Sequence, residues 1–296
     1  MEVPAPQSRL SLPDIFIALV VGLGSLLVYI LTLTPSLSYL SPDGSELATI
    51  PYILGLAHSP GYPLYTWLGY LFSHLLPFGD VAHRVNLMSA VMGAMGVGGL
   101  YLIAILVLPA PLSAIKRAAA ALAALFFAFS PDFWSQSVIA EVYSPNVGML
   151  ALTLLALLAW AYKRKALYYL LFALLFGLSL GAHLSNLGFA PAFALFTLLV
   201  IFSGQPDPAP GEESHLWKVR LHESIGLLVA GSIGFLLGAL QFAWLLLRSN
   251  SLNDRAMLRS SPSSLAGLYR YTLGAFQDFR FAFFPPAVMM PVPDAM

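Results

Sequence analysis

Ionisable side chains gather in one short stretch of an otherwise apolar chain. The chain is 58% hydrophobic and only 9% charged, yet this stretch contains the sequences SPDGSEL, HSPGYPLY and HRVN. Among their residues, Asp43, Glu46, His58 and Arg84 can exchange protons or carry charge. We interpret residues 41–86 as an active-site loop at a membrane surface.

The two acids of SPDGSEL have the spacing of a supported general base. Asp43 lies between a proline and a glycine, which favour a turn, and Ser45 is placed to cap a helix that Glu46 opens. A carboxylate at the mouth of a membrane cavity can act as a general base, with Glu46 supporting it or orienting the acceptor. The alternative is that both acids only complement the dipole at the start of the helix.

The next two motifs offer groups that bind phosphate or sugar. Pro-Gly-Tyr-Pro after His58 is typical of an elbow between helices, while the imidazole could donate to a phosphate or a sugar hydroxyl, beside Tyr62. His58 has no partner at the usual metal-ligand spacing, so we expect no histidine-based metal site. Arg84 starts a hydrophobic span, where it either snorkels to lipid headgroups or grips a lipid-linked phosphate.

A second polar interruption is SPDFWSQSVIAEVYSPN, residues 130–146. It puts Glu141 about one turn inside a predicted span, and an ionisable residue at that depth is costly and marks a functional site. Tyr143 continues the interruption. Trp134 lies at its rim, either as a membrane-belt residue or as a platform for a sugar.

His183 and Asn186 lie between two later spans. A loop histidine is commonly inert. The topology predicted from charge placement nevertheless brings His183 to the same face as Asp43 and Glu141. We therefore include His183 and Asn186 among the substrate-binding candidates.

Composition restricts the class of protein. The 296 residues include 14 basic and 14 acidic side chains and no cysteine. There is thus no basic face for nucleic acid, no disulfide, no thiolate metal site and no cysteine nucleophile. An apolar chain of this kind is an all-α, multi-pass integral membrane protein.

A bilayer core takes roughly 20 apolar residues per helix, and scanning with that length gives about seven spans. They are 15–34, 85–108, 117–130, 138–162, 166–182, 188–203 and 224–247. Residues 1–14 lack the positive region of a cleaved signal peptide, so we expect a cytoplasmic N-terminus before a permanent anchor.

Charge placement sets the topology. If residues 34–84 stay on one side, all four lysines fall on the other side with the N-terminus, as the positive-inside rule expects. Prolines break 46–78 into pieces too short to span, so we predict two interfacial helices, 46–56 and 63–76. Their aromatic residues would lie at headgroup depth: Tyr52, Tyr62, Tyr65, Trp67 and Tyr70. Residues 15–247 then form the membrane module, and 248–296 form an outer C-terminal segment that begins with Arg248.

The ordered blocks SPDGSEL, AHSPGYPLY, HRVN, SPDFWSQSVIAEVY and GLSLGAHLSN resemble the protein O-mannosyltransferase-like membrane proteins of the GT-C glycosyltransferase superfamily. The resemblance covers roughly residues 14–285. It implies a GT-C module of about seven transmembrane helices, with juxtamembrane helices and an acidic catalytic residue in the first outer loop. Many members continue beyond such a module, so the resemblance also implies a truncated or minimal member.

The resemblance further implies inverting transfer of a sugar from a polyprenyl-phosphate donor to a hydroxyl on the non-cytoplasmic side, at the cell membrane in a bacterium. Asp43 matches the family's acidic position and takes its general-base role, with Glu46 beside it. A protein, a glycan and a lipid all remain possible acceptors. Arg84 or Arg248 would stabilise the leaving phosphate.

We expect no metal, although Asp43, Glu46 and Glu141 could share a hard cation through oxygen ligands. Two other functions remain open. One is a proton-coupled lipid or solute transporter with a relay through Glu141 and His183. The other is a non-catalytic protein that binds a lipid-linked glycan.

Overall fold

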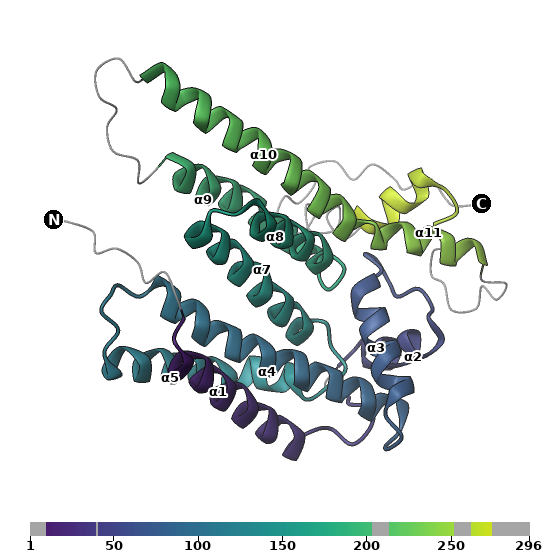
Figure 1. Cartoon of the computed structure of the whole chain (residues 1–296). Helices are drawn as coiled ribbons and strands as arrows, with labels where there is room; N and C mark the ends of the chain where they lie inside the picture. The colour runs from purple at the N-terminus through teal and green to yellow at the C-terminus, as the bar shows by residue number, and fades with distance from the viewer. Residues whose placement is uncertain (1–9, 40, 203–212, 252–261, 274–296) are drawn as a thin grey trace, which may run out of the picture.

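The structure is a computed structural model that describes residues 10–39, 41–202, 213–251 and 262–273. Every regular element in these residues is helical, which confirms the all-α prediction (Figure 1). The elements are α1 (Leu12–Leu31), α2 (Gly44–Ile53), α3 (Pro63–Leu75), α4 (Val81–Val107), α5 (Ala114–Ala128), α6 (Pro131–Ser137), α7 (Tyr143–Lys163), α8 (Ala166–Ser179), η1 (Leu184–Phe189), α9 (Ala190–Phe202), α10 (Glu213–Ala239) and α11 (Gln241–Ser251). Residues 265–273 form a last helical segment.

Each predicted span contains a helix, but not every helix is long enough to cross a bilayer. Five stretches pass by length and composition: Leu12–Leu31, Val81–Val107, Tyr143–Lys163, Leu184–Phe202 and Ser224–Ser251. The pair α5 and α6, bent by 67°, is a sixth candidate. The 14-residue α8 is apolar but short, because a rise of about 1.5 Å per residue gives it roughly 21 Å against a core of about 30 Å. The described residues therefore support five or six spans rather than about seven.

The long helices pack side by side in a row. Helix α4 contacts α1 and α5 on one side and α7 on the other, and α7 contacts α8, which contacts α10 (Figure 1). The two predicted short helices are α2 and α3. They pack against each other and against α4, and α11 packs on α3.

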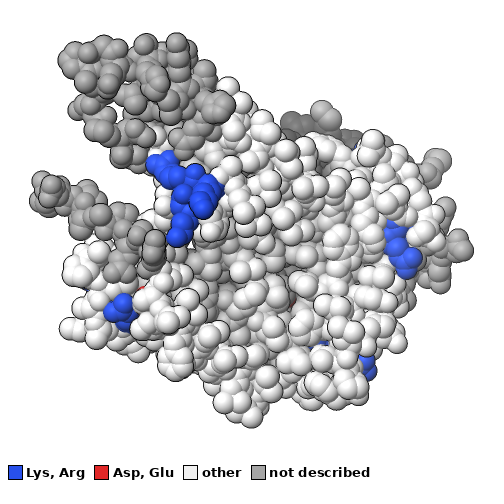
Figure 2. Space-filling model, in the orientation of Figure 1, with Lys and Arg blue, Asp and Glu red and all other residues white. Residues whose placement is uncertain are grey.

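The long helices differ in charge between their two ends. Lys116 and Arg117 lie at the start of α5, and Lys163 and Lys165 flank the junction of α7 and α8. Arg117 pairs with the fully buried Asp14 at the start of α1, with Nε and Oδ1 2.7 Å apart. Figure 2 shows groups of basic side chains toward the left of the molecule, on the side of the N label in Figure 1, and further basic side chains toward the right. The polar motifs lie at the opposite helix ends, as the charge pattern predicts.

Glycines let α8 and α10 approach until their backbones touch. A Cβ on Gly234 would lie 2.4 Å from the carbonyl oxygen of Leu170, and one on Gly238 would lie 2.4 Å from that of Leu174. Small residues four apart are the usual means of close helix packing in membranes. This contact fixes α10, and through it α11, against the rest of the row.

Several sequence expectations fall wholly or partly outside the described residues. These are the start of the N-terminal segment (1–9), the last residue of the span predicted at 188–203, and much of the C-terminal segment (252–261 and 274–296). The domain boundaries at 15, 247 and 248 stay predictions.

The glycine contact predicts that Gly234→Leu destabilises the fold. The added side chain must push the α8 backbone away, and overpacking of this kind costs about 1–3 kcal/mol. Thermal unfolding of the purified protein in detergent should show a lower midpoint. Gly226→Leu is the matched control on the same helix, because nothing lies within 4 Å of a Cβ at that position. Equal midpoints for the two variants would contradict the packing role.

Candidate active site

Asp43 ends a tight turn at the start of α2. The amide of Gly44 donates to the carbonyl oxygen of Ser41, and that of Leu47 donates to the carbonyl oxygen of Asp43 at 2.8 Å. The predicted turn is therefore present. The helix nevertheless begins at Gly44, with Asp43 rather than Ser45 in the N-cap position and without a side-chain cap bond. The carboxylate of Asp43 stays free of the helix end, and its side chain is 54% exposed.

Glu46 ties α2 to the following loop. One of its carboxylate oxygens accepts from the backbone amide of His58 at 2.5 Å, and the other lies 3.2 Å from Nδ1 of the same histidine. Nε2 of His58 is 4.0 Å from Asp43 Oδ2. The hydrogen bond that the imidazole donates to Glu46 is the main reason that the pKa of His58 is raised, with the charge of Asp43 adding to it.

Glu141 approaches the same group from a different part of the chain. It lies in the irregular segment between α6 and α7, which corrects the expectation that it sits one turn inside a span. Ser41 Oγ donates to Glu141 Oε1 at 2.6 Å, and Glu141 is only 7% exposed. Burial raises the pKa of this carboxyl, and the nearby negative charge of Asp43 acts in the same direction.

Aromatic rings continue the group towards α7 and α8. Tyr62 lies edge-on to His58 with ring centroids 5.2 Å apart, and 6.1 Å from His183. The ring of Tyr143, the first residue of α7, also lies 5.8 Å from that of His183. His183 accepts from the amide of Ser185 and lies 2.7 Å from its hydroxyl, and burial lowers the pKa of this imidazole.

We call this group the polar cluster: Asp43, Glu46, His58, Tyr62, Glu141, Tyr143 and His183. Its members come from α2, the loop before α3, the segment before α7 and the connection after α8. The predicted convergence of Asp43, Glu141 and His183 on one face is thus present in the described residues. Two carboxylates lie within 4.0 Å of an imidazole with a raised pKa, an arrangement that can accept a proton from one group and donate to another.

The cluster could also hold a cation. Ligand atoms of Asp43, Glu46 and His58 all lie within 4.8 Å of one another. This corrects the argument that His58 lacks metal-binding partners, because residues 12 and 15 positions away in sequence meet it in space. A mixed set of carboxylate oxygens and an imidazole nitrogen suits a divalent transition metal. A cation there would compete with the imidazole for Glu46.

The two arginines predicted to bind phosphate make hydrogen bonds to backbone carbonyls instead. Arg84 donates from Nη1 to the carbonyl oxygen of Ser73 at 2.6 Å, and from Nε and Nη2 to that of Gly79. Arg248 donates to the carbonyl oxygens of Leu54 and Ile53, at the end of α2. Arg248 thus binds carbonyls at the end of α2, and Arg84 binds one carbonyl in the last turn of α3 and one in the loop before α4.

Two further candidates support the structure around the cluster. Trp134 on α6 donates to Thr32 Oγ1 at 3.0 Å, near the end of α1, so it belongs to the packing of α1 and α5. Asn186 is fully buried and donates to Asn146 Oδ1 at 2.7 Å, which joins η1 to α7.

The expected aromatic belt is only partly present. Tyr65 is completely buried and donates to the carbonyl oxygen of Leu47, and Tyr62 is 8% exposed. These two rings pack inside the protein and do not face headgroups, because α3 is covered by α2 and α4. Tyr52 and Tyr70 are exposed as predicted.

Sequence reasoning missed two residues that contact the cluster. Ser41 binds Glu141, and Tyr271 from the last described segment donates to the carbonyl oxygen of Ala57. Ser41 belongs to a motif already singled out, whereas the sequence carries no signal that links position 271 to position 57.

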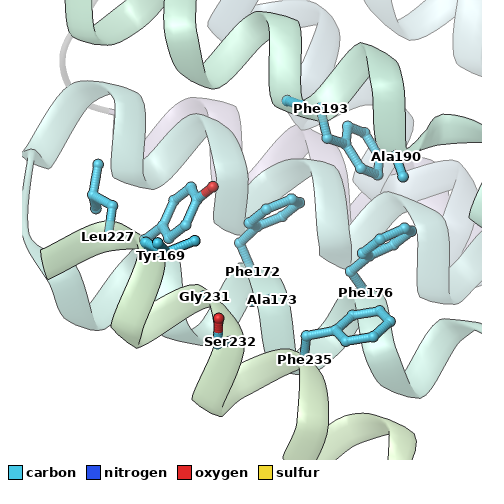
Figure 3. A pocket seen from close by; sticks show the side chains of 12 residues that line it. Tyr169, Phe172, Ala173, Phe176, Ala190, Phe193, Leu227, Gly231, Ser232 and Phe235 are labelled. Atoms are coloured by element: carbon cyan, nitrogen blue, oxygen red, sulfur yellow. The ribbon is translucent and has the colours of Figure 1, made fainter. Parts of the chain in front are cut away.

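An aromatic pocket lies between α8, α9 and α10 (Figure 3). It has a volume of about 290 Å³ and no charged lining residue. Its walls include Tyr169, Phe172, Phe176, Ala190, Phe193, Leu227, Gly231, Ser232 and Phe235. His183 lies in the connection between α8 and α9, two of the helices that line the pocket.

Comparison with known proteins agrees with the motif resemblance. The chain is 34% identical over 144 residues to a protein of Dictyostelium discoideum named protein O-mannosyl-transferase tmem260, and 41% identical over 157 residues to mouse protein O-mannosyl-transferase TMEM260. These alignments cover 48% and 52% of this chain but only 16% and 21% of the relatives. No solved structure matches the chain.

The family match spans the whole cluster. Residues 43–204 match the family described as the protein O-mannosyl-transferase TMEM260 N-terminal domain, and this range contains every cluster member. The matched range is more than half of the chain. The protein therefore belongs to the TMEM260 N-terminal domain family of O-mannosyl-transferases.

Proposed function

We propose that this protein is a GT-C type glycosyltransferase that moves a sugar, with inversion, from a polyprenyl-phosphate donor to an acceptor hydroxyl. The observation that carries the proposal is the convergence of seven chemically active side chains, from four separate segments, inside the range shared with named O-mannosyl-transferases. The acceptor is a protein, as the names of those relatives suggest. The transfer takes place on the non-cytoplasmic face.

Asp43 is the general base. It is the most exposed carboxylate of the cluster, its oxygen atoms are free of the helix cap, and an acceptor can reach it from outside. It removes the proton of the acceptor hydroxyl as the oxygen attacks the anomeric carbon, while the bond from that carbon to the phosphate oxygen breaks. Glu141 is buried beside Ser41 with a raised pKa and is less suited to this role.

The leaving phosphate needs a positive or hydrogen-bonding partner. Arg84 and Arg248 bind backbone carbonyls, so we assign this role to His58 instead. Glu46 raises the pKa of His58 and so favours its protonated form, which can donate to a phosphate oxygen. The rings of Tyr62 and His183 are tilted to each other and that of Tyr62 lies beside His58, where the two rings could contact the sugar.

The aromatic pocket is our candidate for the first units of the donor's hydrocarbon chain. It is apolar, and two of its helices meet at His183. A donor with its phosphate at the cluster can extend along α8 and α9 into this pocket.

The transporter alternative loses its motivation, because Glu141 precedes α7 and does not lie within it.

Asp43→Asn should abolish the base while preserving the turn. We expect turnover to fall by roughly 10²–10⁴-fold, the usual contribution of a positioned base, with little change in donor binding. The assay is sugar transfer by purified protein in proteoliposomes with a polyprenyl-phosphate sugar and a serine- or threonine-containing peptide. Unchanged turnover would reject Asp43 as the base. Donor binding by the wild-type protein without transfer to any acceptor would favour a non-catalytic binder.

Glu46→Gln should alter the pH profile. The variant lacks the charge that raises the pKa of His58, so His58 loses its proton at a lower pH. If transfer needs protonated His58, activity disappears as pH rises through that pKa, and the alkaline limb of the variant moves towards lower pH. An alkaline limb at the same pH in both proteins would argue against His58 as the phosphate donor group.

Filling the aromatic pocket should weaken binding of long-chain donors. Ala194 lines the pocket from α9, and Ala194→Trp should raise KM for a long-chain donor by roughly threefold to tenfold, the effect of about 1 kcal/mol of lost packing. A short-chain donor should show no such increase. Ala192→Trp is the control, since Ala192 is exposed on the same helix and does not line the pocket. A similar rise in KM for both variants would place the chain elsewhere.

A further inference from the structure

The loop that carries His58 is enclosed by a part of the chain outside the family match. The match ends at residue 204, whereas α11 and the helical segment 265–273 pack on residues 53–61. We infer that Tyr271 is a positioning residue, which holds the His58 loop in the geometry that the polar cluster needs. Its consequence for transfer rests on the proposed function, but the positioning itself does not.

Tyr271 makes a hydrogen bond on each side of His58. Its hydroxyl donates to the carbonyl oxygen of Ala57, the residue before the histidine. Its own carbonyl oxygen accepts from the hydroxyl of Ser59, the residue after it, at 2.5 Å. One tyrosine thus binds both neighbours of the imidazole-bearing residue, which restricts rotation of the backbone between them.

The tyrosine ring also fills the space under the loop. Tyr271 is 6% exposed and forms a buried apolar group with Leu56 and Leu245. Gly61 has a φ of +95°, and a Cβ there would lie 2.8 Å from both Leu245 and Tyr271. The loop and the C-terminal elements are therefore fitted to each other at atomic contact.

Arg248 supports the same loop from α11. Its bonds to the carbonyls of Ile53 and Leu54 fix the end of α2, where the chain turns into the loop with Leu54 at a φ of 49°. The loop is thus held at its start by Arg248 and around His58 by Tyr271. Glu46 can bind the amide and the imidazole of His58 together only while this backbone geometry persists.

Tyr271→Phe tests the role of the hydroxyl while keeping the ring and its packing. In the full chain, without substrate, we expect diethylpyrocarbonate to modify His58 about threefold to tenfold faster than in the wild type, the population change that loss of one hydrogen bond produces. Amide hydrogen exchange in residues 54–61 should increase as well. Modification of His74, on α3, should not change. The control is Tyr269→Phe, because Tyr269 is 64% exposed on the same segment.

A second readout separates positioning from general stability. In the transfer assay Tyr271→Phe should lower kcat with KM for the donor unchanged, whereas a partly unfolded protein would lose active molecules and show a lower thermal midpoint. If Tyr271→Phe does not fold, Ser59→Ala removes the second hydrogen bond. Modification of His58 by diethylpyrocarbonate and amide hydrogen exchange in residues 54–61 then test the inference in that variant.

Wild-type rates of His58 modification and loop exchange in a folded Tyr271→Phe protein would overturn the inference. The labelling needs no enzymatic activity. Absence of sugar transfer by the wild-type protein would therefore contradict the proposed function and leave the positioning of the loop standing.

Discussion

The cluster depends on the carboxylate of Glu46, which binds the backbone amide and the imidazole of His58 at the same time. These two bonds join α2 to the loop that carries His58. They also bring Nε2 of His58 to within 4.0 Å of Asp43. The proposed base and the proposed proton donor therefore lie side by side because a third group orients one of them, which is a common arrangement in acid–base sites.

Other members of the cluster are held by contacts between distant segments. Ser41 binds Glu141 across 100 positions, and His183 contacts the rings of both Tyr62 and Tyr143. Close packing of α8 against α10 fixes the helices on which the C-terminal contacts are built. The site is thus a property of the tertiary structure. Loss of an interhelical contact far from Asp43 would change the geometry around it.

Sequence reasoning found the helices, the turn at Asp43 and the shared face of Asp43, Glu141 and His183, because apolar length and charge placement determine these features. It placed Glu141 inside a helix, because the apolar residues around it, Val138 to Val142, do not reveal where α7 begins. It gave Arg84 and Arg248 to phosphate, because the backbone carbonyls that bind them leave no trace in the sequence. Tyr271 was missed since its partner lies 214 positions away.

The stereochemistry of the transfer product tests the central claim most directly. A base that activates an acceptor while phosphate departs in one step must invert the anomeric carbon, since the two groups occupy opposite faces of the sugar. Purified protein, a polyprenyl-phosphate sugar of defined anomeric configuration and an acceptor peptide are sufficient, with the product analysed by NMR. The account predicts a product of the opposite configuration. A product that retains the donor's configuration would contradict a single displacement with Asp43 as base.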